Sequence, residues 1–401
     1  MHQRDGGAGT PPDQTAFRGQ WWEGRGYPAV RLGIVRDLCL TALSRSGVGP
    51  ADARFAVETL LDRDLQGDHL RGIADVPRWV AAFRAGRANP RPRLRVLKET
   101  RSSALIGEDP SGFYLSIARQ SMALCIAKAR REGIAIVGVR KNLGTLAPVL
   151  RIATASGLVA IGTIQGPPSI APSGGTRPVV GNNPVGIGIP AGRLEPLILD
   201  MALSQTSATP IFAAAARARP VPAGLVLDRR GRPTTDPRAF ARVPGEARRG
   251  KASQYLASQP GSFAAGGSLV PVGAYKGYGL ALALGVLTSV LIARHPDSET
   301  EDPAWYEARP GTLLLALAPA LFCVPGAFAR GVARELSRVV GSPRKSGAAR
   351  LFYPGQRSAE IRTARRRANL LPLPTAVRRS LVRLAEELEI EADLAIVASA
   401  K

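Results

Sequence analysis

Apolar side chains recur at intervals of three and four residues near the start of the chain, on one face of each expected helix. Gly47 and Gly49 interrupt this spacing, and Pro50 suits the first turn of the next helix. A proline-rich break at residues 89–92 then precedes an apolar segment of strand length. The pattern predicts helices over Ala29–Arg45, Ala51–Asp62 and Val76–Ala85, followed by a strand over Arg93–Glu99.

The middle of the chain alternates between helical spacing and short apolar runs bounded by glycine or polar residues. Such alternation is typical of layered α/β architectures, so the fold class is predicted to be α/β. The expected helices are Ser116–Glu132, Leu146–Ala155 and Ser204–Ala218. The expected strands are Ile134–Val139, Leu158–Ile164, Gly186–Ile189 and Leu197–Leu199.

The remainder mixes turns with long apolar segments. We expect a surface turn over Val226–Pro237 and an irregular basic segment over Ala239–Ser262. The apolar stretches are too short to cross a bilayer, and the polar N-terminus has no apolar core of a signal peptide, so a cytoplasmic location without membrane contact is expected. The other expected elements are helices over Lys276–Ala293, Phe328–Val340 and Ala376–Leu388 and a strand over Thr312–Leu317.

Composition changes this picture only through its charge. The 401 residues are 45% hydrophobic and 21% charged, as in globular proteins, but the net charge is +23. Because the arginines are spread along the chain without interleaved aromatics, nucleic-acid binding is not favoured. The densest run, Arg362–Arg367, is expected near a helix start and suits an acidic partner or nucleotide phosphates. Three widely spaced cysteines predict buried free thiols, with neither disulfides nor a metal site.

Two glycine-rich segments carry the candidate chemistry. The segment Pro167–Pro184 contains Gly174 and Gly175, where positive φ and close backbone approach to a ligand are possible. Its exposed N–H groups suit a pyrophosphate, although a loop without a ligand fits equally well. Gly273–Leu280 opens a helix, and Lys276 in the first turn is unfavourable for the helix dipole unless an anion accompanies it. A solvated lysine is the alternative.

Several motifs in fixed order make the chain resemble the malate/L-lactate dehydrogenase type 2 family, with its sulfolactate and ureidoglycolate dehydrogenases and cyclic ketimine reductases. The resemblance runs from about Val35 to Ile396. It is carried mainly by SIAPSGG (169–175), GNNPVGIGIPAG (181–192), LILDMALS (197–204), GRPTTDP (231–237), AYKGYGLALALGVL (274–287) and YPGQ (353–356).

The resemblance implies a non-Rossmann NAD(P)-binding domain flanked by a helical part from both chain ends, and a homodimer. The expected parts are a loose tail (1–28), a helical N-terminal part (29–110), the NAD(P)-binding α/β domain (111–320) and C-terminal helices packed on the N-terminal part (321–401). It also implies cofactor contacts, to NADPH or NADH, for Ser173, Gly174, Gly175, Asn182, Asn183, Pro184, Lys276 and Gly277. The excess of arginine slightly favours NADPH, because an extra phosphate needs a cation.

The family's catalytic pattern is poorly kept. Where the family has Ser-His-Gly followed by an arginine, this chain has Arg71 in place of the histidine and Asp75 in place of the arginine. The family's second histidine is also absent, since Asn142-Leu143-Gly144 runs shorter than Asn-His-Phe-Gly. Oxidising an alcohol needs a base and reducing a ketone needs an acid, whereas an iminium brings its own positive charge. Reduction of C=N is therefore the chemistry least affected by these losses.

Four residues are candidates for the substrate side. His69 lies two positions from the lost histidine, and Lys141 acts as an acid or cation if it is desolvated. Either is also compatible with an ordinary surface position. Arg71 could hold a carboxylate with two hydrogen bonds or simply pair with Asp68 or Asp75. Arg140 is the fourth candidate.

These observations predict an NAD(P)H-dependent reductase that delivers a hydride to the C=N or C=O carbon of a small 2-oxo or 2-imino acid, in specialised biosynthesis. The alternative is a homologue that has lost redox turnover and serves as a binding protein, a scaffold or a non-redox enzyme. The two readings differ in whether NAD(P)H bound to the protein is oxidised by any substrate.

Overall fold

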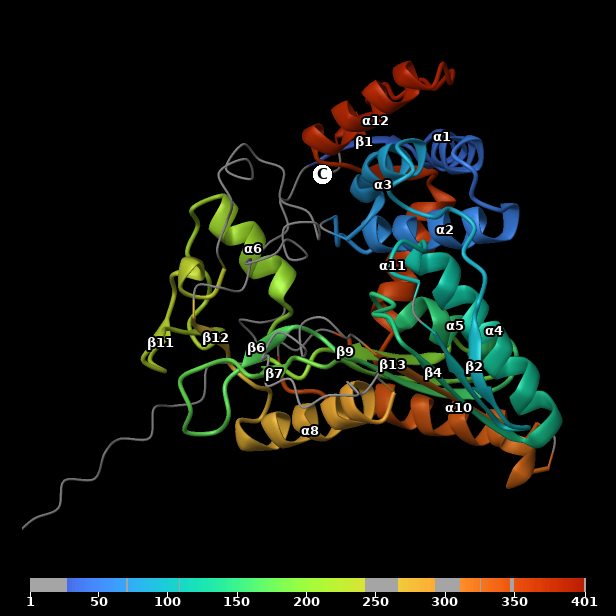
Figure 1. Ribbon diagram of the computed structural model, residues 1–401, viewed down its shortest axis with the longest axis vertical. Coiled ribbons are helices and arrows are strands. Elements are labelled where there is room, and N and C mark those ends of the chain that lie inside the picture. Colours follow the sequence, from blue (N-terminus) through green and yellow to red (C-terminus); the bar gives the residue numbers. More distant parts are fainter. Residues whose placement is uncertain are drawn as a thin grey trace, which may run out of the picture.

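A seven-stranded sheet forms the centre of the molecule in a computed structural model (Figure 1). The structure describes residues 27–69, 71–107, 109–241, 266–292, 311–324, 326–346 and 350–399. Within these, five of the six strand pairs in the large sheet are antiparallel and only β3 with β4 is parallel. The strand order is β2 (Val96–Glu99), β3 (Ser103–Ile106), β4 (Ile134–Val139), β13 (Thr312–Leu317), β5 (Val159–Ile164), β8 (Val185–Ile189) and β9 (Leu197–Met201).

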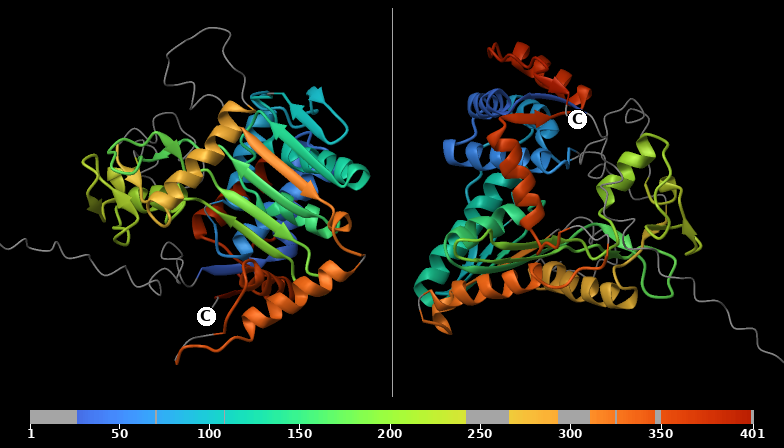
Figure 2. Two further views of the ribbon diagram at one scale, coloured as in Figure 1. Left: turned by 90° about the horizontal axis from the view of Figure 1, so that it is seen from below. Right: turned by 180° about the vertical axis from the view of Figure 1, so that it is seen from behind.

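Two helices cover one face of this sheet, α4 (Tyr114–Glu132) and α5 (Ala147–Ala155). The side chains of β4 alternate between the two faces of the sheet, which explains why one face packs against these helices. Ala135, Val137 and Val139 are fully buried on the helix-covered face, and Ile134 and Ile136 face the other side. Along that other side run α8 (Tyr275–Gly285) and α10 (Ala327–Val340), as Figures 1 and 2 show. The structure is therefore a mixed α/β fold, as predicted.

Both chain ends meet in a small sheet above α4 and α5. Strand β1 (Pro28–Arg31) lies between β14 (Leu370–Pro372) and β15 (Ala398–Ser399), and both pairs are antiparallel. One buried apolar core joins the surrounding helices. These are α1 (Leu32–Arg45), α2 (Pro50–Leu65), α3 (Val76–Arg84) and α12 (Thr375–Glu387), and α11 (Gln356–Arg367) packs on α2.

A third, peripheral sheet carries the glycine-rich segments. Its order is β11 (Pro233–Thr234), β10 (Val226–Leu227), β12 (Ser268–Leu269), β6 (Pro168–Ile170) and β7 (Val180–Gly181), with α6 (Ala208–Ala216) packed beside it. The predicted turn over Val226–Pro237 is confirmed only for residues 228–232, because its first two residues form β10 and Pro233–Thr234 form β11. The Asp228 carboxylate accepts hydrogen bonds from the backbone N–H groups of Arg230 and Arg232 at its tip.

Several sequence expectations are corrected. The first three residues of the expected helix Ala29–Arg45 belong to β1, because they pair with two strands of the C-terminal part, β14 and β15. Only Ala208–Ala216 of the expected Ser204–Ala218 is helical. The expected helix from Lys276 turns into a wider π-helix at Val286–Val290, where the Thr288 and Ser289 hydroxyls donate to carbonyls one turn earlier. Three parts of the expectations lie outside the described residues: Ala293 at the end of that expected helix, residues 1–26, and most of Ala239–Ser262.

The arginine run Arg362–Arg367 was also placed wrongly, because it forms the second half of α11 and does not start a helix. Arg366 Nη2 lies 2.6 Å from Glu58 Oε2 and 2.8 Å from Asp62 Oδ1, both on α2. Arg365 donates to the Leu65 carbonyl oxygen at the end of the same helix. Arg365 and Arg366 therefore hold α11 against α2.

Candidate active site

Four loops meet at one end of the large sheet. Because β13 is antiparallel to β4 and β5, the residues after β4 and β5 lie beside the residue before β13. Asn142 Nδ2 donates to the Gln165 carbonyl oxygen at 2.9 Å, and the Gln165 N–H donates to the Gly311 carbonyl oxygen at 2.8 Å. The buried Asn183 side chain accepts from the Gly166 N–H and donates to the Ala281 carbonyl oxygen on α8. These bonds fix the loops to one another and to α8.

A small polar cavity lies at this end of the sheet, where α2 approaches α4 and the loop before α5. Its volume is about 10 Å³, which is room for about one water molecule. Two arginines, a tyrosine and two threonines supply its polar groups. The lining residues of this polar cavity are Thr59, Leu60, Arg63, Arg71, Tyr114, Gly144 and Thr145.

The two guanidinium groups of the polar cavity share one carboxylate. Asp68 Oδ2 lies 2.8 Å from Arg71 Nη2 and 3.5 Å from Arg63 Nη1. Arg63 also lies 3.7 Å from Asp200, which accepts from the Thr145 hydroxyl and the Ala147 N–H at the start of α5. Burial, and then the neighbouring Arg71, lower the pKa of Arg63. The two arginines therefore face two carboxylates, Asp68 and Asp200, and Arg63 Nη2 also contacts the Thr145 hydroxyl. A ligand carboxylate would bind here through the guanidinium N–H groups that these partners leave unused.

Tyr114 supplies the neutral polar group of the polar cavity. Its ring packs against Trp79 and Phe113, with centroids 5.7 and 5.9 Å apart, so the phenol is held in place by aromatic contacts. Burial raises the pKa of Tyr114, and the Asp75 charge adds to the rise. The phenol therefore keeps its proton at neutral pH and can donate a hydrogen bond to a ligand in the polar cavity.

Asp75 occupies the position where the resembled family has arginine, and its side chain is 4% exposed. Burial raises the pKa of Asp75 to about 6, against partial compensation from Arg78, whose Nη2 is 3.6 Å away. In the unfolded chain the same carboxyl has a pKa near 3.8. Because the folded state holds the proton more tightly, the free energy of unfolding falls as pH rises from about 4 to about 6, and the loss persists at higher pH.

Replacing Asp75 with asparagine is therefore expected to stabilise the protein at neutral pH. The expected gain in the free energy of unfolding is about 1–3 kcal/mol near pH 8, because a pKa unit corresponds to about 1.4 kcal/mol and Arg78 offsets part of the burial. Near pH 4 the gain should vanish, since the wild-type carboxyl is then protonated in the folded state. Urea unfolding at both pH values measures the difference. A loss of stability near pH 8 would show that the Arg78 pair outweighs the burial.

The other substrate-side candidates lie in different surroundings. His69 Nδ1 is 2.7 Å from the fully buried Asp64 carboxylate, and its ring packs edge-on against Tyr27. Lys141 Nζ donates to the carbonyl oxygens of Asp109 and Pro110 at 2.7 and 3.1 Å, and burial lowers its pKa.

Arg140 Nε donates to the Ile292 carbonyl oxygen. Of the four substrate-side candidates, Arg71 alone lines the polar cavity in the described part of the chain, and it also pairs with Asp68 as the alternative interpretation expected. The roles of His69, Lys141 and Arg140 stay predictions.

The first glycine-rich segment forms an exposed turn between β6 and β7. Ser173, Gly174 and Gly175 are exposed, Gly174 has a φ of 81°, and the space beside its Cα is open. The turn lies against the β10–β11 connection, since a Cβ on Gly231 would be 3.8 Å from the Gly175 carbonyl oxygen. The exposed arginines of these two loops are Arg177, Arg229, Arg230 and Arg232.

The second glycine-rich segment starts α8 beside that turn (Figures 1 and 2). Lys276 is exposed in the first turn of the helix. Gly277 permits a close approach of α8 to the preceding chain, because a Cβ there would lie 2.1 Å from the Val272 carbonyl oxygen. The Asn183 side chain is satisfied within the fold, whereas the Ser173–Gly175 turn and Lys276 remain open to a ligand.

Sequence reasoning missed four polar residues of this site: Arg63, Tyr114, Thr145 and Asp200. Asp200 lies inside the motif LILDMALS, so its place in a family motif was an available signal. Arg63 lies in ADARFAVETLLDRDLQG (51–67), another segment that carries the resemblance, so the same signal was available. Tyr114 had none, because only the packing of α4 brings it to the site. In the ranges that the structure describes, no group of three or more His, Cys, Asp and Glu side chains could hold a metal ion. None of the helices described there is long and apolar enough to cross a membrane.

Comparison with known proteins adds the following. The profile of the malate/L-lactate dehydrogenase family matches residues 31–382. The chain is 30% identical over 354 residues to a (2R)-3-sulfolactate dehydrogenase (NADP(+)) of Chromohalobacter salexigens, which covers 87% of this chain and 95% of the relative. It is 26% identical over 266 residues to a Delta(1)-pyrroline-2-carboxylate/Delta(1)-piperideine-2-carboxylate reductase of Pseudomonas syringae pv. tomato, covering 63% of this chain and 71% of that reductase.

Among solved structures, the sulfolactate dehydrogenase of Methanocaldococcus jannaschii superposes with a TM-score of 0.72 at 25% identity. The match covers 90% of this chain and 98% of that one. The fold is therefore shared over nearly the whole length of both chains.

Proposed function

The chain belongs to the malate/L-lactate dehydrogenase family, and from this premise we propose that it is an NAD(P)H-dependent reductase acting on the C=N or C=O bond of a small 2-imino or 2-oxo acid. The observation that carries the substrate class is the pair Arg63 and Arg71 in the polar cavity, two partly buried cations beside a phenol that keeps its proton. The group that would bind between them is a carboxylate.

The exposed loops fit a dinucleotide. The open Ser173–Gly175 turn, its neighbouring arginines and the cation at the start of α8 form a surface that suits a pyrophosphate and an additional phosphate. We assign Ser173, Gly174, Gly175, Asn182, Pro184, Lys276 and Gly277 to this binding surface, with Asn183 holding the loop from inside. Bound NAD(P)H supplies the hydride from its nicotinamide ring. NADPH is the favoured form, because exposed arginines can bind its extra phosphate.

On the substrate side, Arg71 and Arg63 would bind the carboxylate and fix the orientation of the carbon next to it. The polar cavity has room for about one water molecule, so it would take one carboxylate oxygen and the rest of the substrate would lie outside it. Asp68 and Asp200 hold the two guanidinium groups in position from behind. The division into a dinucleotide-binding α/β domain of non-Rossmann type and a helical part from both chain ends is part of the same proposal.

Tyr114 is the proton donor that this arrangement favours. A carbonyl oxygen that receives a hydride at its carbon becomes an alkoxide and needs a proton, which the Tyr114 hydroxyl can give. An iminium nitrogen becomes a neutral amine on the same step and needs none.

Replacing Tyr114 with phenylalanine is expected to lower kcat for a 2-oxo acid by about 100-fold and kcat for a cyclic 2-imino acid by less than about tenfold. Steady-state kinetics with both substrates, at saturating NADPH, measures the contrast. Equal losses for the two substrates would argue for a positioning role, and no loss for either would remove Tyr114 from the reaction.

The proposed function itself is tested by supplying substrates of both classes to the protein with NADPH. We expect faster oxidation of NADPH by five- and six-membered cyclic 2-imino carboxylates than by open-chain 2-oxo acids, since the family histidines are absent. Binding of NADPH without oxidation by any member of either class would favour a redox-inactive homologue.

A homodimer is part of the proposal. Along α8 and its π-helical continuation, large apolar side chains are left uncovered by the described part of this chain, which supports contact with a second copy. They are Leu280 (46% exposed), Leu282 (38%), Val286 (44%), Leu287 (39%), Val290 (39%) and Leu291 (67%). We expect sedimentation to report twice the 42.3 kDa mass of the chain.

A further inference from the structure

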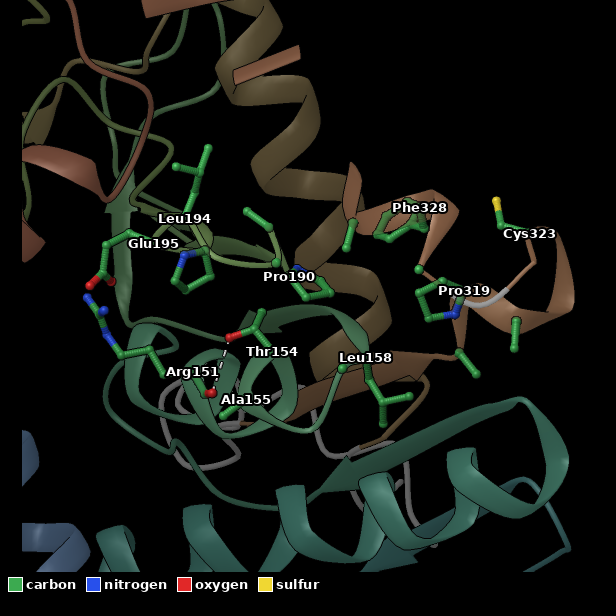
Figure 3. A pocket seen from close by; sticks show the side chains of 18 of the residues that line it. Arg151, Thr154, Ala155, Leu158, Pro190, Leu194, Glu195, Pro319, Cys323 and Phe328 are labelled. Carbon is green, nitrogen blue, oxygen red and sulfur yellow. Dashed lines mark hydrogen bonds between the residues drawn. The ribbon is translucent and has the colours of Figure 1, made fainter. Parts of the chain in front are cut away.

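A second, much larger cavity lies at the opposite end of the large sheet from the polar cavity. Its volume is about 760 Å³, and Figure 3 shows it from close by. Leu158, which precedes β5, and Ala318, which follows β13, both line it. The polar cavity adjoins the other ends of these strands, where Ile164 pairs with Thr312. This far cavity is therefore a separate site.

The walls of the far cavity are mainly apolar. One wall is the C-terminal half of α5, the second is the turn between β8 and β9, and the third runs from the end of β13 into α10. The volume lies in the range of small-molecule sites, about 300–1,000 Å³. The large apolar lining residues are Leu158, Pro190, Leu194, Pro319, Val324 and Phe328.

Charged residues gather at one end. Arg151, Glu195 and Arg362 all line the far cavity, so two cations face one carboxylate. Arg362 lies 3.6 Å from Asp62 and 3.8 Å from Glu195. Asp62 is also bound by Arg366 at 2.8 Å, so its charge is shared between two arginines.

Arg151 is the group without a close counter-ion. Figure 3 shows its side chain pointing toward Glu195, but within the described residues its guanidinium takes part in no salt bridge of 4.0 Å or less. Burial, and then the neighbouring Arg362, lower its pKa to about 10, against the more distant charges of Asp62 and Glu195. An anion placed between the two arginines would give Arg151 a counter-ion in direct contact.

We propose that the far cavity is a ligand site for a small organic anion, with a carboxylate or sulfonate head at Arg151 and Arg362 and an apolar body along the proline, leucine and phenylalanine walls. The site is distinct from the proposed hydride-transfer site, and the proposal does not depend on that function.

Cys323 provides a direct reporter of occupancy. Cys39 and Cys125 are fully buried, as predicted for all three cysteines, and burial raises the pKa of both thiols, that of Cys125 to about 12. Cys323 corrects the prediction, because it is partly exposed and lines the far cavity at the end away from Arg151 (Figure 3). An alkylating reagent should therefore react first at Cys323, and a bound ligand should slow that reaction.

The test measures the rate of Cys323 alkylation by iodoacetamide, located by peptide mass spectrometry, with anilinonaphthalene sulfonate as the probe. Phenylnaphthylamine, which has the same aromatic body without the sulfonate, is the neutral control. We expect saturable protection by the sulfonate. Arg151→Gln should raise the half-protecting concentration about tenfold or more, because hydrogen bonds to charged groups are worth that factor. The same charge change at the exposed Arg130, Arg130→Gln, should leave it unchanged.

A second variant keeps the test informative if Arg151→Gln fails to fold. Leu194 is 40% exposed and lines the far cavity, so Leu194→Glu adds a negative charge with little effect on folding. It should abolish protection by the sulfonate and weaken protection by phenylnaphthylamine much less. The proposal would be overturned if the sulfonate protected Cys323 equally in the wild type, Arg151→Gln and Leu194→Glu. It would also be overturned if the sulfonate gave no protection of the wild type. The proposal would also be overturned if, without any probe, the rate of Cys323 alkylation decreased as the protein concentration increased, because a second copy would then cover the cavity.

Discussion

Replacing Arg71 with glutamine is expected to lower kcat/KM for the 2-imino or 2-oxo acid by about 100-fold or more, mostly through a higher KM. Arg71 lines the polar cavity and is already oriented by two contacts to Asp68. Glutamine offers one uncharged amide group as a hydrogen-bond donor, whereas the guanidinium offers two N–H donors that carry a positive charge. Removing the charge also leaves Asp68 with only the more distant Arg63, so a ligand carboxylate would meet an excess of negative charge.

Steady-state kinetics on Arg71→Gln measures this effect, and three controls isolate it. Arg71→Lys retains the charge but not the two parallel donors, so it should fall between wild type and glutamine. Arg84→Gln makes the same charge change at an exposed position of α3 and should change nothing. The Kd for NADPH should be the same in all variants. An unchanged kcat/KM in Arg71→Gln would remove the polar cavity from substrate binding.

Replacing Lys276 with glutamine is expected to raise the Kd for NADPH by about tenfold to a hundredfold. The lysine is exposed in the first turn of α8, where the partial positive charge of the helix already attracts anions. In the free protein the Lys276 charge interacts unfavourably with the helix dipole, and only a bound phosphate offsets this interaction. The measurement is a titration followed by nicotinamide fluorescence, with Lys98→Gln on the exposed strand β2 as a matched control.

The comparison of the two cofactors locates the phosphate that Lys276 binds. If Lys276→Gln raises the Kd for NADH and for NADPH equally, Lys276 binds the pyrophosphate. If it raises only the Kd for NADPH, Lys276 binds the additional phosphate. If neither Kd changes in Lys276→Gln, the start of α8 is not part of the cofactor surface.

The central elements could be predicted because their apolar patterns are long and continuous. β4 and β13 have the expected bounds, since Ile134–Val139 and Leu313–Leu317 are unbroken runs without charged or polar side chains. Strands of two or three residues such as β7 and β12 have no periodicity to detect. β1 was predicted as helix because its pairing partners are at the other end of the chain.

In the candidate site, too, features set by neighbouring residues in the sequence could be predicted, whereas features set by tertiary packing could not. The glycine turns and Lys276 are local features, so their exposure and backbone conformation follow from the residues themselves. The polar cavity depends on where α2 and α4 pack, and the sequence therefore suggested Arg71 but neither Arg63 nor Tyr114. The sequence could not place His69 either, because its partner Asp64 is buried by tertiary contacts.

Titration of the protein with NADPH and with NADH, followed by nicotinamide fluorescence, tests directly whether it is an NAD(P)H-dependent enzyme. We expect saturable binding of at least one form, tighter for NADPH, weakened by Lys276→Gln and unaffected by Arg71→Gln. An absence of binding of both forms at millimolar concentration would contradict it.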